Sequence, residues 1–416
     1  MVLQRIGCPP ILRQLIFSFH EDMKGTVQFD DRTSDSFDIR GGVKQGCILA
    51  PTLFGIFFAM LLEYAFRTSP GDVFLHWRTD GSLFNITRLK AKTKISSSLL
   101  RDLLFADDAA LVAHNGNTLQ IMMNHLTHAC QAFSLIISVK KTATLTQTGT
   151  PTATITLDNS PLQTVEKFCY LGSTITTSTS LDEELNARIG KAGTSFGKLN
   201  KRAWNNKMLT LRTKIKIYEA CVLSSLPYGA ETWTLYSSQE KRLNTYHLRC
   251  LRKIMGISWE DRKTNSEVLE LAGLPSMFTI LGKRRLRWLG HLRRMDDSRI
   301  PKQLLYGEMA QGTRPRGRPK LRFKDKCKST LTKFNINPSK FEDTADGRTA
   351  WKSTLTAGAK HNENNIISAA AQKRQARKEN PPVPCGALTE EYFFYKNDCR
   401  GKRNGPQNEK LENHFN

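Results

Sequence analysis

One stretch decides the fold, and it reads Arg101-Asp102-Leu103-Leu104-Phe105-Ala106-Asp107-Asp108-Ala109-Ala110-Leu111-Val112. Two adjacent aspartates, Asp107 and Asp108, stand in it between two short apolar runs. Neither run has the 3.6-residue periodicity of a helix. The pattern therefore predicts two strands joined by a tight turn, with both carboxylates at its tip.

The two carboxylates repel each other at such a turn, and a bound divalent cation offsets that repulsion. Magnesium suits them because it takes hard oxygen ligands, often one or two carboxylates together with the phosphates of a substrate. The alternative is an ordinary solvated turn, in which aspartate is common because its side chain bonds the local backbone. The dipeptide alone favours the ordinary turn, so the surrounding sequence decides.

Three further motifs stand around this stretch. They are Gly41-Gly42-Val43-Lys44-Gln45-Gly46-Cys47-Ile48-Leu49-Ala50-Pro51-Thr52-Leu53-Phe54 upstream, and Ser138-Val139-Lys140-Lys141-Thr142 and Phe168-Cys169-Tyr170-Leu171-Gly172-Ser173 downstream. Together with Phe105-Ala106-Asp107-Asp108, they resemble in kind and order the palm motifs of reverse transcriptases. The residues within these motifs resemble those of the reverse transcriptases of non-LTR (LINE-like) retrotransposons, and the similarity extends to about residue 355.

The resemblance implies an α+β fold of the right-hand polymerase type. The expected parts are a palm with an antiparallel sheet and helices, then a helical thumb and a basic tail. By residue number, we expect a partial fingers and palm domain over 1–175, a thumb-like region over 176–300, a basic nucleic-acid-binding extension over 301–380, and a disordered tail over 381–416.

The implied activity is RNA-directed DNA polymerisation, a two-metal nucleotidyl transfer onto a primer 3′-hydroxyl. Asp107 and Asp108 would hold magnesium, of which the intact family site carries two ions. Lys141, which we expect in a strand-like stretch, would assist the departing pyrophosphate as a general acid or a fixed charge. Without the family context, Lys141 would be interpreted as an exposed lysine at a strand end. The implied partners are an RNA template, a DNA primer and deoxynucleoside triphosphates.

Two other groups of residues receive roles from the same resemblance. The glycine-rich loop lets the template base and the incoming nucleotide approach the main chain. Its binding residues are Gly42, Lys44, Gln45, Gly46 and Pro51, and the proline suits the first turn of the helix that follows. The later hairpin would grip the primer through Tyr170, Leu171 and Gly172.

The first ten residues resemble a family segment that follows the first palm motif by about a dozen residues. That motif carries the aspartate that bridges both metal ions. We therefore expect this chain to be truncated and inactive alone. A non-catalytic nucleic-acid-binding relic of a retroelement is the alternative function, whereas a carboxylate-dependent nuclease would need further acidic or histidine clusters that the sequence lacks.

The charge points to a polyanionic partner, because the 416 residues carry a formal net charge of +24 and the pI is about 9.8. Half of that surplus lies in residues 281–330, where sixteen Lys and Arg face four acidic residues. Within it, Arg314, Arg316, Arg318 and Lys320 form a segment that resembles an AT-hook. A flexible basic loop that tracks phosphates without reading sequence is the favoured interpretation.

Residues 181–273 show helical periodicity. Apolar positions recur there in three series: Leu181, Leu185 and Ile189; Leu211, Ile215, Tyr218 and Val222; and Leu243, His247, Cys250 and Ile254. Trp204, Trp233 and Trp259 are expected to be buried more readily than to stack on bases.

The nine cysteines are scattered, which indicates reduced thiols in an intracellular, nuclear or cytoplasmic protein. A zinc site is not favoured, because Cys385, Cys399 and His414 form no C-x-x-C pair. The apolar run at 48–66 is interrupted and falls short of the ~20 residues that cross a bilayer, so we expect no membrane association. The oligomeric state is left open.

Overall fold

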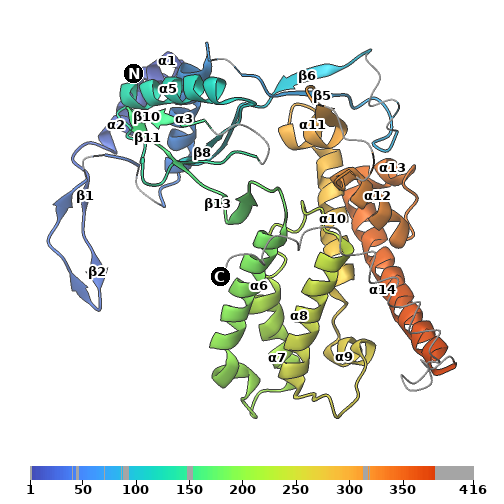
Figure 1. Ribbon diagram of the computed structural model, residues 1–416. Coiled ribbons are helices and arrows are strands. Elements are labelled where there is room, and N and C mark those ends of the chain that lie inside the picture. The colour runs from blue at the N-terminus through green and yellow to red at the C-terminus, as the bar shows by residue number, and fades with distance from the viewer. Residues whose placement is uncertain are drawn as a thin grey trace, which may run out of the picture.

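The structure is a computed structural model, and it describes residues 2–379 except 40, 44–45, 70, 86, 88–92, 148–152, 313–316 and 318. A mixed part of short strands and helices occupies one end of the molecule, and long helices run from it to the other end (Figure 1). Among the described residues, no helix combines the length and apolar character needed to cross a bilayer.

The aspartate stretch forms the expected hairpin. Strand β7 (Asp102–Phe105) pairs antiparallel with β8 (Asp108–Leu111), so that Phe105 lies opposite Asp108. Only Ala106 and Asp107 form the turn, and Ala106 takes a left-handed conformation with φ of 54°. A two-residue turn of this kind follows the twist of the strands and fixes their register. Both carboxylates are therefore held at the tip.

Two helices pack behind this hairpin. They are α3 (Ala50–Phe66) and α5 (Gly116–Ala132). Their shared core contains Leu61, Ala65, Phe66, Met122, Leu126, Ala129 and Cys130. Helix α5 begins where the side-chain oxygen of Asn115 accepts a bond from the Thr118 amide at 2.8 Å, an N-cap that satisfies one of the free amides. Arg101 ties the hairpin to α3, because its guanidinium donates to the Phe66 carbonyl at 2.8 Å.

The other strands build several small sheets rather than one continuous sheet. Four two-stranded antiparallel pairs accompany the β7–β8 hairpin: β1 (Lys24–Gly25) with β4 (Phe37–Asp38), β2 (Gln28–Phe29) with β3 (Arg32–Thr33), β10 (Thr156–Leu157) with β11 (Ser160–Pro161), and β13 (Lys167–Tyr170) with β14 (Ser173–Thr176). Strand β9 (Ala143–Thr144) pairs parallel with β12 (Gln163–Thr164).

One sheet joins distant parts of the sequence. Strand β5 (Phe74–Trp77) pairs with β6 (Ser96–Leu99) on one side and with β15 (Gly307–Met309) on the other. Helix α11 (Ile300–Tyr306) leads directly into β15. The stretch around β5, within the expected palm, is therefore bound to the stretch expected to form the basic extension.

The expected thumb is a helical body with its own core. Its elements are α6 (Asp182–Lys198), the π-helices η1 (Asn200–Trp204) and η2 (Glu219–Leu223), α7 (Leu211–Tyr218), α8 (Ser237–Met255) and α9 (Asn265–Ala272). The three apolar series face this core except at Leu211, which is 41% exposed, and Leu185, Tyr218, Val222 and Leu243 are fully buried. Trp204 and Trp233 are buried as expected, whereas Trp259 is 86% exposed in the loop before α9.

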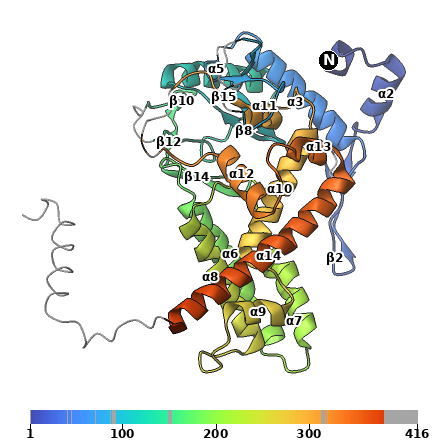
Figure 2. The ribbon, with the colours of Figure 1, turned by 90° about the vertical axis from the view of Figure 1, so that its right-hand side faces the viewer.

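A second helical group packs against this body. It consists of α10 (Met277–Arg294), α12 (Phe323–Lys333), α13 (Phe341–Asp346) and α14 (Arg348–Glu379), and α14 crosses the molecule obliquely (Figure 2). Two short helices, α1 (Val2–Arg5) and α2 (Pro10–Ser18), stand at the N-terminal end of the chain.

The helices α10 and α14 pack closely together. The indole of Trp351 in α14 lies against Gly290 in α10, where an added Cβ would sit 2.1 Å from Nε1. Only glycine allows α10 and α14 to approach so closely.

His247 provides a test of the thumb core, because it is fully buried and its Nδ1 lies 2.8 Å from the Tyr218 hydroxyl. Burial lowers the pKa of His247 to about 4. The unfolded chain, with an ordinary histidine pKa near 6.5, binds a proton first as the pH falls. We expect the free energy of unfolding to decrease between about pH 6.5 and pH 4, by at most about 3 kcal/mol from this residue.

The measurement is urea unfolding across that pH range for the parent protein and for His247→Gln, which cannot take up the proton. The variant should show a shallower pH dependence, and exposed His114→Gln should match the parent. Parallel curves for His247→Gln and the parent would contradict the assignment.

Candidate nucleic-acid and metal-binding site

Asp107 and Asp108 are both exposed at the tip of their hairpin. Among the described residues, neither carboxylate has an ion-pair or side-chain hydrogen-bond partner, and no group of three or more His, Cys, Asp or Glu is placed to hold a metal ion. The two side chains thus present adjacent hard oxygen ligands to solvent. Their donor atoms are of the kind expected for one side of a divalent-metal site.

The later hairpin touches the aspartate hairpin. The Tyr170 hydroxyl, at the end of β13, donates to the carbonyl of Leu103 in β7 at 3.2 Å. Burial, and after it the charge of Asp108, raises the pKa of Tyr170 above its ordinary value. Residues expected to grip the primer therefore lie directly beside residues expected to bind metal.

The turn between β13 and β14 consists of Leu171 and Gly172, both in the left-handed region with φ of 48° and 79°. This geometry suits a two-residue hairpin, but leucine adopts it at a cost of about 1 kcal/mol. Three groups of the helical body bind the turn. Arg188 donates to the Gly172 carbonyl, the Tyr228 hydroxyl donates to the Leu171 carbonyl at 3.5 Å, and the Glu184 carboxylate accepts from the Thr174 amide at 2.7 Å.

The glycine-rich loop is described only in part. Gly42 and Gly46 both have positive φ, 85° and 88°, and are exposed. Pro51 lies in the first turn of α3, as expected. Lys44 and Gln45 lie outside the described residues. The open glycine backbone is compatible with close approach of a ligand, and the contacts expected of Lys44 and Gln45 stay predictions.

Lys141 differs from its expected local structure. It is exposed in a turn, two residues before β9, rather than in a strand-like stretch. The reason is the Ser138 carbonyl, which accepts from the amides of Lys141 and Thr142 at 3.1 and 3.0 Å and so closes the chain into a turn. Its proposed role toward pyrophosphate is not tested by this placement.

The AT-hook-like segment is also described only in part, because Arg314, Arg316 and Arg318 lie outside the described residues. Lys320 is placed, and its ammonium donates to the Ser178 carbonyl at 3.1 Å, in the loop that joins β14 to α6. The described end of the segment, at Lys320, therefore lies next to the loop that follows the Tyr170 hairpin.

Much of the positive charge in residues 281–330 is used inside the fold. At least seven of its cations form ion pairs with acidic side chains: Arg284, Arg285, Arg287, Arg293, Lys302, Arg322 and Lys326. Arg285 and Lys326 are buried, and both face Glu240 of α8, at 3.7 and 2.9 Å. The charge count from sequence thus overstates the surface available to nucleic acid.

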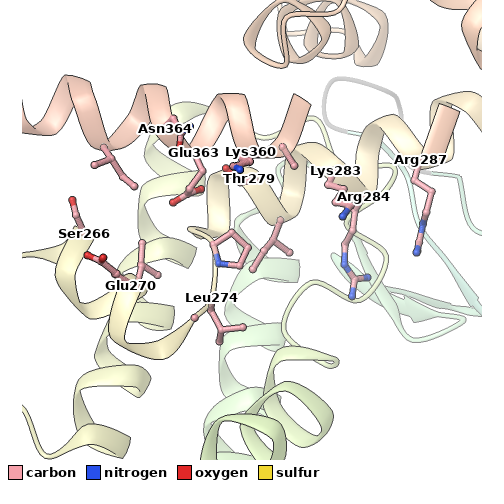
Figure 3. Close-up of a pocket in the computed structure, with 16 residues that line it drawn as sticks. Ser266, Glu270, Leu274, Thr279, Lys283, Arg284, Arg287, Lys360, Glu363 and Asn364 are labelled. Atoms are coloured by element: carbon pink, nitrogen blue, oxygen red, sulfur yellow. The ribbon is translucent and has the colours of Figure 1, made fainter. Parts of the chain in front are cut away.

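A pocket of about 760 Å³ lies between α9, α10 and α14. Lys283, Arg284 and Arg287 extend from α10 at one end of it, and Glu363 and Asn364 extend from α14 (Figure 3). Leu269, Leu274 and Ile280 are among its apolar lining. None of the sequence-predicted site residues lines this pocket, so it is separate from the aspartate hairpin.

Comparison with known proteins identifies the part of the chain that carries the two hairpins. Residues 2–175 match the family described as "Reverse transcriptase (RNA-dependent DNA polymerase)". They form a reverse transcriptase domain. The matched range contains the glycine-rich loop, the aspartate pair, Lys141 and the Tyr170 hairpin, in the order expected.

Two relatives extend the similarity beyond this domain. The chain is 24% identical over 252 residues to a transposon-derived protein of Caenorhabditis elegans, an alignment that covers 58% of this chain and 88% of that protein. It is 24% identical over 267 residues to the RNA-directed DNA polymerase from mobile element jockey of Drosophila funebris, covering 62% of this chain and 26% of that protein. Both relatives are described as products of transposons or mobile elements.

The sequence analysis did not identify the residues that hold the Tyr170 hairpin to the helical body. Glu184 and Arg188 stand four apart at the start of α6, a spacing that permits an ion pair on one helix face. That spacing was the available signal. It did not indicate that the pair would be buried or that it would bind a turn of the preceding hairpin.

The contact between the hairpins can be tested through the pKa of Tyr170. Removing the nearby negative charge with Asp108→Asn should lower that pKa, because the charge of Asp108 disfavours the phenolate. Asp107→Asn, one residue away in the turn, is the matched control and should have a smaller effect. Carbon-13 NMR titration of labelled tyrosine measures both, and an unchanged Tyr170 pKa in Asp108→Asn would contradict the placement.

Proposed function

We propose that this chain binds a primer–template and acts as the RNA-directed DNA polymerase domain of a non-LTR retrotransposon. One observation carries the proposal: the Tyr170 hydroxyl bonds to the Leu103 carbonyl, so the primer-grip hairpin lies against the aspartate hairpin. In nucleotidyl transfer, the primer 3′-hydroxyl and the metal ligands must be neighbours. The family match supports the class of substrate, namely an RNA template, a DNA primer and nucleoside triphosphates.

The aspartate pair fits a divalent metal in its donor chemistry. Asp107 and Asp108 offer carboxylate oxygens, which magnesium prefers, and they are exposed with no competing cation among the described residues. Bound magnesium would supply activation of the primer 3′-hydroxyl and charge neutralisation on the triphosphate. Asp107 is the proposed first ligand and Asp108 its partner.

Other residues would position the substrates. The glycine backbone at Gly42 and Gly46 would lie against the nucleotide, with Lys44 and Gln45 contacting phosphate and base and Pro51 starting the helix behind them. Lys141 would meet the pyrophosphate. The primer end would be contacted by Tyr170, Leu171 and Gly172. The basic segment from Arg314 to Lys320 would bind the nucleic-acid backbone.

A second function, nucleic-acid binding without catalysis, is favoured by a different observation. Two-metal transfer needs carboxylates on both sides of ions about 3.5 to 4 Å apart. The described residues contain no cluster of three potential ligands. We therefore propose that residues 1–416 bind a primer–template, and that incorporation needs a further carboxylate besides those of Asp107 and Asp108.

The first experiment measures primer extension with magnesium or manganese. Residues 1–416 should bind primer–template and incorporate no nucleotide. The same chain preceded by an upstream segment with the first palm aspartate should extend the primer, and Asp107→Asn in it should reduce the rate to less than about a tenth with little change in melting temperature, because a metal ligand contributes more to rate than to folding.

Asp158→Asn is the matched control, because Asp158 also lies in a two-residue hairpin turn, between β10 and β11. It should leave extension unchanged. Incorporation by residues 1–416 alone that Asp107→Asn abolishes would contradict the need for a carboxylate that residues 1–416 lack in the active arrangement. It would direct attention to Asp22, Asp30 and Asp31.

The second experiment concerns the basic segment. Replacing Arg316, Arg318 and Lys320 together with alanine should weaken primer–template binding and flatten its salt dependence by up to about three phosphate equivalents. Fluorescence anisotropy at several salt concentrations measures the slope. The triple variant Arg316→Lys, Arg318→Lys, Lys320→Arg keeps all three positive charges at the same positions and should leave the slope unchanged. Equal slopes for the basic-segment variant and the parent would rule out contact with the backbone.

A further inference from the structure

The turn of the primer-grip hairpin is held from outside the hairpin. Its two carbonyls accept hydrogen bonds from Arg188 and Tyr228, and the amide of Thr174 donates to Glu184. Glu184 and Arg188 lie in the first turns of α6, and Tyr228 lies between η2 and α8. The helical body therefore binds backbone groups whose position does not depend on the hairpin side chains.

The two charged residues form a buried ion pair. Arg188 Nε lies 2.6 Å from Glu184 Oε1, and the side chains are 6% and 2% exposed. The Arg188 guanidinium also lies over the Tyr228 ring, 4.4 Å from its centroid. Burying such a pair gives little net stability, because loss of hydration offsets the attraction. The pair instead fixes the local geometry, because Glu184 and Arg188 each form a further hydrogen bond with the backbone at the turn.

A continuous set of contacts leads from this pair to the aspartates. Arg188 and Glu184 hold residues 172 and 174, Tyr170 adjoins that turn, and its hydroxyl bonds to Leu103 of the strand that leads to Asp107. The left-handed Leu171 also needs external contacts to offset its backbone cost. The position of α6 thus sets the position of the turn relative to the aspartate tip.

We propose that Glu184 and Arg188 are positioning residues that fix the primer 3′-end beside Asp107 and Asp108. The proposal rests on the proposed function, in which residues 170–172 grip the primer. Through this ion pair, α6, the first helix of the thumb, determines the geometry of the primer site. Neither Glu184 nor Arg188 contacts the primer itself. Its loss should displace the 3′-end while overall affinity, which comes mainly from phosphate contacts elsewhere, is retained.

The decisive variant is the exchange Glu184→Arg with Arg188→Glu. It keeps a buried ion pair, but it places a carboxylate against the Gly172 carbonyl and a guanidinium against the Thr174 amide, so both turn contacts are lost. Arg188→Lys is the milder variant, because lysine keeps the charge but cannot donate to Glu184 and Gly172 in the same fork geometry. If the exchange does not fold, Arg188→Lys carries the test.

Glu183→Gln is the matched control. Glu183 is the neighbour of Glu184 on α6 and pairs with Lys167 of the same hairpin, but at 3.8 Å and with both side chains exposed. Glu183→Gln removes a negative charge directly beside the buried pair without touching the turn. Exposed pairs of this kind contribute little, so Glu183→Gln should behave as the parent in every measurement.

The experiment uses residues 1–416 with a primer–template whose primer ends in photoreactive 4-thiothymidine. It records the dissociation constant, the melting temperature and the peptide to which the 3′-end crosslinks. The parent should crosslink within residues 103–108 or 170–173. The exchange variant and Arg188→Lys should lose at least about fivefold of that crosslink per bound complex, with the dissociation constant within about twofold.

Two results would overturn the proposal, and they are distinguishable. If folded variants bind and crosslink as the parent does, Glu184 and Arg188 are structural only, and the proposed function stands. If the parent binds without any crosslink to either hairpin, the primer-grip assignment itself fails, and the positioning role fails with it.

Discussion

The arrangement of the site depends on the buried ion pair between Glu184 and Arg188. Hydrogen bonds link the β13–β14 hairpin to the aspartate hairpin on one side and to the helical body on the other. A hairpin of four-residue strands has little stability in isolation. Because the pair is almost completely buried and its hydrogen bonds have defined directions, it holds the turn in one position. A pair of exposed charges, free to move in solvent, would not do so.

A different use of charge organises the C-terminal helices. Arg285 and Lys326 both face Glu240 in the interior, so the acidic residue of α8 holds α10 and α12 together. Burial lowers the pKa of Lys326, the hydrogen bond and charge of Glu240 act in the opposite direction, and the charge of Arg285 lowers the pKa further. Arg285 and Lys326 belong to the basic range that the charge count associated with nucleic-acid binding, yet in the structure they join helices.

Local features were predictable from sequence, and features that depend on distant partners were not. The aspartate hairpin follows from two apolar runs around a short polar turn, and the buried faces of α6 and α8 follow from helical spacing. Lys141 was misplaced because the Ser138 carbonyl, rather than a neighbouring strand, satisfies the following amides. The burial of Arg285 was missed since a run of lysine and arginine usually indicates a solvated face.

The pairing of β15 with β5 has a consequence for the time course of folding. Residues 307–309 are made 230 or more positions after residues 74–77. At a synthesis rate of about 5–20 residues per second, β5 waits roughly 10 to 50 s for its second partner. During that interval its outer edge is unpaired, and unpaired edges associate with other chains. The nascent protein should therefore depend on chaperones until α11 and β15 have left the ribosome.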